Sequence, residues 1–340
     1  MIRFQLRKIK TFATSSHHTP ASPHLLPTFD QQILGPLEQF EYKDRGFFAN
    51  KQTLRLLKDA HVEQVTPKLG SDIRGIQLSK LDSQQLDQLA YYVAERGVVF
   101  FRDQDIQGNV DVLTQIGQHF SPKLHVHQTY GIPKDMPHVH VVTQADYTHD
   151  MFDKLTNAVR WHTDVSYELQ PPGLTFLAIQ DVPLGGGGDT IWSNQYEAYN
   201  RLSPSMKQFL ETLTATHSAH EQAKHALETG LPLRRPPVAN IHPVIRTHPV
   251  TGKKALYVNP MFTRKINELK QEESQMLLKF LYNHVALGAD FQARFKWEKW
   301  TVAVWDNRVT CHTAIVDYDF VNEKRHAVRV TPQAERPILV

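Results

Sequence analysis

The sequence predicts a mainly β protein with flanking helices, in which the strands form a β-barrel or jelly-roll core. Many short runs rich in β-branched and aromatic residues alternate with turns that contain glycine or proline, which is the pattern of an antiparallel β fold. A few amphipathic segments of helical period lie between these runs. No internal repeat indicates a solenoid or a propeller.

The first predicted elements precede the chemical motifs. Residues 61–78 predict short strands joined by a turn that contains glycine. A helix is expected to begin with Ser83 as its N-cap and to end at Gly97, because apolar residues recur on one face: Leu86, Leu89, Ala90 and Val93. The run VVFF at 98–101 is typical of a buried strand. A second helix is predicted over 110–119.

Further elements follow the central motif. Ser203 and Pro204 are expected to open a helix as its N-cap and first residue. The polar residues 217–240, rich in His, Pro and Arg, predict an insertion or a lid loop. Residues 242–259 predict a hairpin that turns at Thr251, Gly252 and Lys253. An amphipathic helix is expected over 272–285. Three strand-like runs complete the pattern: 300–309, 311–318 and 325–332.

Composition places the chain among soluble globular proteins, with 41% hydrophobic and 21% charged residues. No apolar run approaches the ~20 residues of a membrane span. The single cysteine, Cys311, excludes an intramolecular disulfide and a zinc site built from several cysteines, and it favours a reducing compartment. Beyond residue 29, 34 basic residues face 35 acidic ones, so the body carries no electrostatic signature of nucleic-acid binding.

The N-terminal part is expected to differ from the rest of the chain. Residues 1–60 predict an extension that is partly disordered or a targeting segment, and residues 61–340 predict a single domain. Residues 1–29 contain four bases and no acid, which is similar to a mitochondrial transit peptide. A disordered basic tail on a cytoplasmic protein is the favoured alternative, because the segment is short and contains only two arginines.

A His-x-Asp pattern, His162-Thr163-Asp164, is the first candidate for a metal site. In an extended strand, residues two apart point to the same face, so this imidazole and carboxylate can reach one ion. His312 lies in a strand-like run and is the best candidate for a third ligand. Two histidines and one carboxylate leave positions open on iron(II), which suits an oxygenase. A pattern this short also arises by chance. Whether it marks a metal site therefore depends on the surrounding motifs.

Five motifs strengthen this interpretation through their order and spacing: WHTDVSYELQPPG, GGDTIW, HPVIRTHPVTGKKALYVN, WDNRVTCH and RHAVR. Together they resemble the TauD/TfdA family of iron(II)- and 2-oxoglutarate-dependent dioxygenases, and most of all the sulfonate and alkylsulfate dioxygenases of its fungal branch. The resemblance covers roughly residues 62–337. It implies a double-stranded β-helix (jelly-roll) core and an oxygenase that uses iron(II), 2-oxoglutarate and O2.

The resemblance also implies which residues bind the metal and the co-substrate. His162, Asp164 and His312 match the iron ligands and hence the catalytic centre. Thr190 matches the hydroxyl that binds the distal carboxylate of 2-oxoglutarate, and Arg325 matches the arginine that binds the same carboxylate. The residue type agrees with this role, because a guanidinium is a planar, permanently charged fork suited to a carboxylate.

Three further residues are implied to bind a small anionic organic substrate. His127 matches a substrate-binding histidine, the backbone N–H of Val165 matches a contact to the anionic end, and Arg329 matches the arginine that binds that end. Because Arg325 and Arg329 are four residues apart, both are expected on one face of a strand and in one cavity. Two arginines in one cavity predict two anions. The alternative is a solvated arginine pair on an edge strand.

The expected reaction hydroxylates the carbon next to the anionic group, with ascorbate supporting activity. A taurine-like alkanesulfonate would yield sulfite, an aldehyde, succinate and CO2. Alkyl sulfates and other organic anions remain open as substrates. A jelly-roll metal-binding protein or zinc hydrolase without oxygenase activity would keep the three ligands, but it would not need Thr190 together with Arg325. Homo-oligomers are common in the family, so a homo-oligomer is one expected state.

Overall fold

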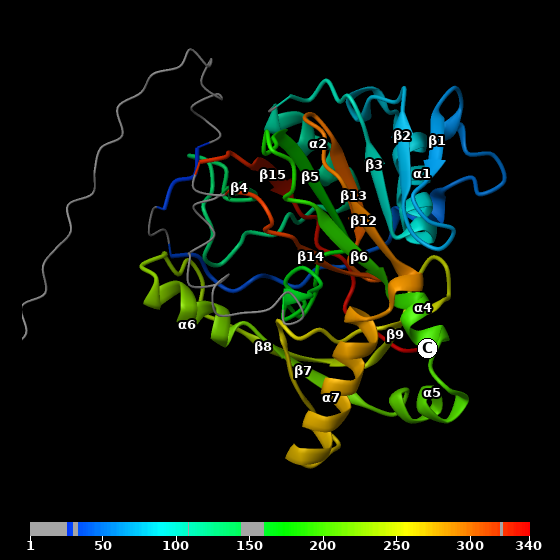
Figure 1. The fold of residues 1–340 in the computed structure, drawn as a ribbon, viewed down its shortest axis with the longest axis vertical. Coiled ribbons are helices and arrows are strands. Elements are labelled where there is room, and N and C mark those ends of the chain that lie inside the picture. Colours follow the sequence, from blue (N-terminus) through cyan, green and yellow to red (C-terminus); the bar gives the residue numbers. More distant parts are fainter. Residues whose placement is uncertain (1–25, 30–32, 108, 144–159, 320–321) are drawn as a thin grey trace, which may run out of the picture.

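The structure is a computed structural model that describes residues 26–29, 33–107, 109–143, 160–319 and 322–340. In this part of the chain strands predominate and helices flank them (Figure 1), as the sequence predicts. The largest sheet has the strand order β1-β2-β3-β13-β5-β15-β4. Its strands are β1 (His61–Gln64), β2 (Ser71–Arg74), β3 (Val98–Phe101), β4 (Val139–Thr143), β5 (Leu174–Asp181), β13 (Val302–Asp306) and β15 (His326–Val330).

One face of this sheet is covered by two helices, α1 (Ser83–Arg96) and α2 (Val110–Phe120). Because side chains alternate along a strand, every second residue meets the helices. Val99 and Phe101 of β3 pack in one core with Leu89 of α1, whereas Phe100 belongs to a second core on the opposite face of the sheet. This explains why the run VVFF is apolar throughout, since both of its faces are buried.

The opposite face packs against a smaller sheet with the order β12-β6-β14. This sheet consists of β6 (Thr190–Asn194), β12 (Gln292–Phe295) and β14 (Thr310–Ala314). Aromatic rings fill the space between the two sheets: Trp192 lies 5.2 Å from Phe100 and 5.8 Å from Trp305, measured between ring centroids. The two sheets therefore enclose a core to which β6 and β14 contribute side chains from one side, and β5, β13 and β15 from the other.

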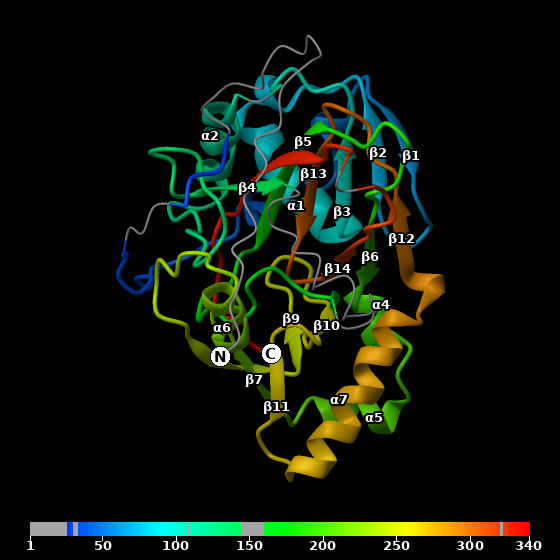
Figure 2. The ribbon, with the colours of Figure 1, turned by 60° about the vertical axis from the view of Figure 1, so that its left-hand side comes forward.

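The remaining elements form a separate layer, away from α1 and α2 in both views (Figures 1 and 2). It contains the sheet β11-β7-β8, the hairpin β9-β10, and four helices that precede, interrupt or follow these strands in the sequence. The strands are β7 (Thr214–Ser218), β8 (Ala239–Pro243), β9 (Ile245–Thr247), β10 (Lys254–Leu256) and β11 (Thr263–Ile266); the helices are α4 (Gln195–Asn200), α5 (Pro204–Leu210), α6 (His220–Glu228) and α7 (Gln271–Ala286). The predicted hairpin is confirmed.

Two local predictions from the sequence are wrong. The first helix is capped by Asp82 and not by Ser83: the Asp82 carboxylate accepts from the backbone N–H of Gln85, whose side chain bonds back to Asp82 in a capping box. Residues 217–240 are not a structureless lid loop, because they contain the end of β7, the whole of α6 and the start of β8. The prolines and arginines of this segment all follow α6, at 232–237, and they dominated the composition on which the loop prediction rested.

The segment before β1 packs on the body of the protein. It forms the 3-10 helices η2 (Arg45–Phe48) and η3 (Arg55–Leu57); two further 3-10 helices, η4 (Leu78–Lys80) and η7 (Ala289–Phe291), lie later in the chain. Arg45 forms a bidentate ion pair with Asp87 of α1, with N–O distances of 2.6 and 2.9 Å. The predicted division of the chain into an extension (1–60) and a single domain (61–340) stays a prediction. Most of the predicted targeting segment 1–29 lies outside the described residues, which begin at residue 26.

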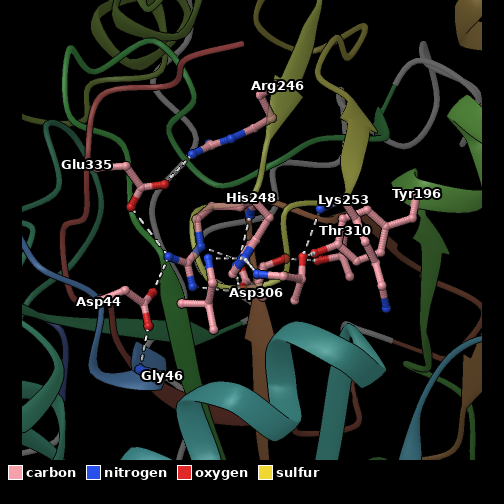
Figure 3. A network of polar contacts seen from close by, with 12 residues as sticks. Asp44, Gly46, Tyr196, Arg246, His248, Lys253, Asp306, Thr310 and Glu335 are labelled. Atoms are coloured by element: carbon pink, nitrogen blue, oxygen red, sulfur yellow. Dashed lines mark hydrogen bonds and ion pairs between the residues drawn. The ribbon is translucent and has the colours of Figure 1, made fainter. Parts of the chain in front are cut away.

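A buried network of charges joins this segment to the end of the chain (Figure 3). Arg308 donates to both oxygens of Asp306, at 2.8 and 2.7 Å, and it also forms ion pairs with Asp44 and Glu335. His248 of the β9-β10 hairpin contacts the same Asp306 carboxylate at 3.0 Å. Arg308 is 1% exposed and Asp306 is fully buried. Three distant segments therefore meet at the turn between β13 and β14.

Candidate active site

The two predicted histidine ligands are brought together by their own backbones. His162 and His312 form an isolated antiparallel bridge, in which each backbone N–H donates to the other residue's carbonyl, at 2.9 and 2.8 Å. The Thr163 hydroxyl donates to the carbonyl of Thr310 at 3.0 Å. The His-x-Asp segment is thus paired with the edge of β14, which also pairs with β6 on its other side.

The three ligand side chains converge on one point. One oxygen of Asp164, Oδ1, lies 3.8 Å from His162 Nε2 and 3.9 Å from His312 Nε2. The three candidate ligand atoms all lie within 4.8 Å of one another. Such a spacing allows one ion to contact two imidazole nitrogens and one carboxylate oxygen at about 2 Å each, with its other positions open. The donor set therefore suits a divalent metal such as iron(II).

The protonation states also suit a metal. Burial lowers the pKa of His162 and lowers that of His312 to about 3, so both rings are neutral at pH 7. Burial alone would raise the pKa of Asp164, but Arg329 and the two histidines outweigh it and hold that pKa well below its usual range. His162 donates from Nδ1 to the carbonyl of Arg160 at 2.9 Å, which leaves Nε2 as the free ligand atom.

Aromatic rings orient the other histidine. The ring centroid of His312 lies 5.0 Å from that of Trp305 and 6.2 Å from that of Trp192, with the latter pair stacked. Trp192 is directly opposite His312 in the β6-β14 register. Both tryptophans belong to the core between the two sheets, so packing fixes the direction of the imidazole.

A cavity that is partly open to solvent lies in front of these ligands. It collects all eight residues that the sequence analysis singled out: His127, His162, Asp164, Val165, Thr190, His312, Arg325 and Arg329. The alternative of a solvated arginine pair is wrong for these arginines, because Arg325 is 5% exposed and the side chain of Arg329 is 12% exposed. The cavity therefore holds more positive than negative side chains, and Asp164, the candidate metal ligand, is the one carboxylate that lines it among the described residues.

Thr190 and Arg325 lie at one end of this cavity. The indole Nε1 of Trp297 donates to Thr190 Oγ1 at 3.2 Å, so the threonine hydroxyl is left to donate its own hydrogen to an acceptor. Arg325 Nε donates to the carbonyl of Gly188 at 3.0 Å. Gly188 has φ of +70°, and a Cβ there would lie 3.0 Å from the Arg325 side chain. Glycine thus permits both the turn and the close approach.

Arg329 lies nearer the metal ligands than Arg325. It occupies β15, whereas Arg325 precedes this strand, and the β15-β5 register is irregular between His326 and Ala327. The expectation that both arginines share one strand face is therefore wrong in detail, although both side chains reach the cavity. Arg329 donates to Asp164 Oδ1 at 2.7 Å. Its charge thus contacts the metal-binding carboxylate directly.

His127 and Val165 have features that suit contacts to an anion. Burial lowers the pKa of His127 well below its usual value, so its ring is neutral. The backbone N–H of Thr129 donates to His127 Nδ1 at 3.3 Å, which leaves Nε2 as the N–H donor. Val165 has φ of +39°, which is rare for a β-branched residue and marks local strain directly after Asp164.

Several lining residues were not identified from the sequence: Tyr130, His140, Arg160, Gln222, Met261 and Phe262. His140 is the cross-strand neighbour of Arg329 in the β4-β15 pair. Its ring stacks on Tyr130, with centroids 4.6 Å apart. The pairing of β4 with β15, which are far apart in the sequence, brings His140 beside Arg329, so no local motif could have revealed this residue.

Two neutral imidazoles and a carboxylate beside a cationic cavity form a donor set that suits a divalent metal ion next to small anions. The family model described as taurine catabolism dioxygenase TauD, TfdA family matches residues 61–331. The chain is 46% identical over 326 residues to an alpha-ketoglutarate-dependent sulfonate dioxygenase of Saccharomyces cerevisiae, covering 93% of this chain and 78% of that protein. It is 30% identical over 285 residues to an alkylsulfatase of Acinetobacter baylyi, covering 81% and 85%.

A solved structure agrees with these relatives. A taurine dioxygenase from Burkholderia xenovorans superposes with a TM-score of 0.66 at 29% identity, covering 82% of this chain and 92% of that one. The chain therefore belongs to the TauD/TfdA family of 2-oxoglutarate-dependent dioxygenases. Within the described part of the chain, no helix is long and apolar enough to cross a membrane.

Proposed function

We propose that this chain is an iron(II)- and 2-oxoglutarate-dependent dioxygenase that hydroxylates an alkanesulfonate at the carbon next to sulfur. The hydroxylated product then collapses to an aldehyde and sulfite, while 2-oxoglutarate is converted to succinate and CO2. The observation that carries the proposal is the placement of Arg325 and Arg329 in one cavity with the His162-Asp164-His312 set. The alkanesulfonate is supported by the 46% identity to a sulfonate dioxygenase.

Each part of the cavity has a distinct role in this proposal. His162, Asp164 and His312 hold the iron. Bound there, iron supplies the redox chemistry that couples the decarboxylation of 2-oxoglutarate by O2 to hydroxylation of the substrate. Thr190 and Arg325 bind the distal carboxylate of 2-oxoglutarate, because one is a free hydroxyl donor and the other a fixed guanidinium.

The substrate anion is bound on the other side of the metal ligands. Arg329 supplies its counter-charge, and His127 donates from Nε2 as a neutral ring. The backbone N–H of Val165 is a third donor for the same anion. Because Arg329 contacts Asp164, the sulfonate is held beside the metal, which places the adjacent carbon near the reacting centre.

Alkyl sulfates are a second candidate substrate, favoured by the 30% identity to an alkylsulfatase. The same cavity residues would bind either anion, since both present three oxygens on a tetrahedral sulfur. We further propose a double-stranded β-helix core, a single domain over 61–340, and ascorbate as an aid to turnover. A cytoplasmic location is also proposed and is supported by the buried, unpaired Cys311.

Succinate formation tests the proposed function. Protein loaded anaerobically with iron(II) is given 2-oxoglutarate, ascorbate and O2, with taurine, longer alkanesulfonates and alkyl sulfates in separate reactions. Succinate formed together with an equal amount of sulfite would support the sulfonate, and sulfate in place of sulfite would support the alkyl sulfate. Iron-loaded protein that forms no succinate with any of these anions would contradict the proposal.

Arg325→Ala is expected to raise the KM for 2-oxoglutarate by about two orders of magnitude, because a buried charged hydrogen bond to the distal carboxylate is lost. Metal affinity is expected to persist, since Arg325 contacts none of the three ligands. The measurements are 2-oxoglutarate saturation curves and a metal titration. Lys324→Ala is the matched control, because that neighbouring cation is 58% exposed and pairs with Asp181 at 3.1 Å. An unchanged 2-oxoglutarate KM would contradict the assignment.

A further inference from the structure

The two carboxylate oxygens of Asp164 have different surroundings. Oδ1 faces both histidine nitrogens and accepts from Arg329. Oδ2 faces away from them and accepts from the hydroxyl of Thr175 at 2.8 Å. Thr175 lies on β5, directly opposite Trp305 of β13, and it is fully buried. One oxygen is thus held by the sheet and the other is presented to the metal position.

Asn307 fixes the direction of this hydrogen-bond chain. Its Oδ1 accepts from the backbone N–H of Asp164 at 3.2 Å and from Trp305 Nε1 at 3.1 Å. Both of these groups can only donate, so the other end of the Asn307 side chain must be its NH2 group. This NH2 donates to Thr175 Oγ1 at 2.8 Å. The Thr175 hydroxyl, having accepted there, has its hydrogen free for Asp164 Oδ2.

We propose that Thr175 and Asn307 are positioning residues that present Asp164 to the metal through a single oxygen. The inference rests on the proposed function for the identity of the metal. A facial triad leaves three of six positions on iron(II), which the co-substrate and O2 both need. A carboxylate that bound through both oxygens would occupy one of these positions. Holding Oδ2 in a hydrogen bond keeps that position open.

The turn that carries Asn307 is itself held in place. Asp306 and Arg308 flank it, and both belong to the buried ion-pair network around the β13-β14 turn. Asn307 is 1% exposed, and its own backbone N–H donates to the carbonyl of Gly173 at 2.8 Å. The positioning chain therefore begins at a part of the fold with little freedom to move, as is needed to hold a ligand within a few tenths of an ångström.

The test compares Thr175→Val with Thr175→Ser. Valine has the shape of threonine without its hydroxyl, whereas serine keeps the hydroxyl. Co(II) affinity is measured by competition with a chelator, and thermal unfolding of the metal-free proteins checks the fold. Thr175→Val is expected to bind Co(II) about 10- to 100-fold more weakly, as for other residues that support a metal ligand. Thr175→Ser is expected to stay within about threefold of the wild type.

Asn307→Asp is the second variant, because it replaces the donating NH2 by a carboxylate oxygen of nearly the same size. A carboxylate at this position can only accept from the Thr175 hydroxyl, so that hydroxyl is no longer available to donate to Asp164 Oδ2. Co(II) binding is therefore expected to weaken as well. Wild-type Co(II) affinity in both Thr175→Val and Asn307→Asp would overturn the inference. Equal weakening in Thr175→Ser and Thr175→Val would also overturn it, since volume and not the hydroxyl would then matter. A wild type that binds no Co(II) would instead refute the proposed function.

Discussion

Replacing Arg308 by leucine is expected to lower the free energy of unfolding by about 3–5 kcal/mol, the usual cost of removing one partner from a buried ion pair. The guanidinium is 1% exposed and contacts the carboxylates of Asp44, Asp306 and Glu335. Asp44 and Asp306 are 2% and 0% exposed, so leucine would leave two buried carboxylates without this partner. The network stabilises the fold because each buried charge is paired with an opposite one, which offsets the free-energy cost of removing both from water.

Urea unfolding at pH 7 measures this effect. Arg55→Leu is the matched control, because Arg55 pairs with Asp82 at 3.2 Å and both side chains are about half exposed. An exposed pair contributes about 0–1 kcal/mol, so the control should unfold close to the wild type. If Arg308→Leu were no less stable than Arg55→Leu, the network would not hold the N-terminal segment and the β13-β14 turn as we infer.

The same network predicts a pH dependence of stability. Burial alone would raise the pKa of Asp306, but Arg308 and His248 outweigh it and hold that pKa far below the ordinary value of 3.8. A depressed folded-state pKa stabilises the fold above the unfolded pKa, and this contribution is lost as the pH falls below about 4. Unfolding measured from pH 7 to pH 3 should therefore show less acid dependence in Arg308→Leu than in the wild type.

The three candidate metal ligands could be proposed from the sequence because they lie in motifs with their own local geometry, and the structure brings their ligand atoms within 4.8 Å of one another. His162 and Asp164 are two residues apart in an extended segment, and His312 follows a strand with a recognisable apolar pattern. The hairpin and the helices α1, α2, α5 and α7 were also predictable from turn residues and period, whereas the cap of α1 was one residue off and α6 was missed. These features depend on neighbours within a few residues, which a single sequence displays.

Residues that act through distant pairing could not be found in this way. Thr175 reaches Asp164 because β5 pairs with β13, and Asn307 reaches both because the β13-β14 turn folds back on the His-x-Asp segment. In the sequence, Thr175 is one polar residue in an apolar strand. From the sequence, Trp297 is likewise indistinguishable from any other core aromatic residue. It reaches Thr190 because β12 pairs with β6.

Asp44 shows a similar limit. It belongs to the predicted N-terminal extension, in which no pattern singles out this carboxylate as one that will be buried. In the structure, however, its carboxylate forms an ion pair with the buried guanidinium of Arg308, which is more than 260 residues away in the sequence. Sequence patterns reveal buried apolar faces far better than they reveal which buried charges will meet, because charge pairing leaves no periodic trace.

Arg329→Met is expected to lower kcat/KM for the sulfonate at least about 30-fold, while the KM for 2-oxoglutarate changes little. Methionine keeps an unbranched stem as far as the position of Nε and removes the charged group that binds the substrate anion. Arg329→Lys keeps a charge but lacks the planar fork, so it should fall between Met and the wild type. Succinate formation is measured as a function of sulfonate at saturating 2-oxoglutarate, and as a function of 2-oxoglutarate without sulfonate, so that the two effects are separated.

This prediction is sharpest when set beside Arg325→Ala, because the two arginines lie in one cavity and differ mainly in their partners. Arg325 bonds to Gly188 near Thr190, whereas Arg329 bonds to the metal-binding Asp164. If the roles are assigned correctly, one variant raises the KM for 2-oxoglutarate alone and the other impairs sulfonate use alone. The opposite pattern would exchange the two roles. Equal loss of both affinities in both variants would mean that the arginines act as one general positive field, with no separate anion sites.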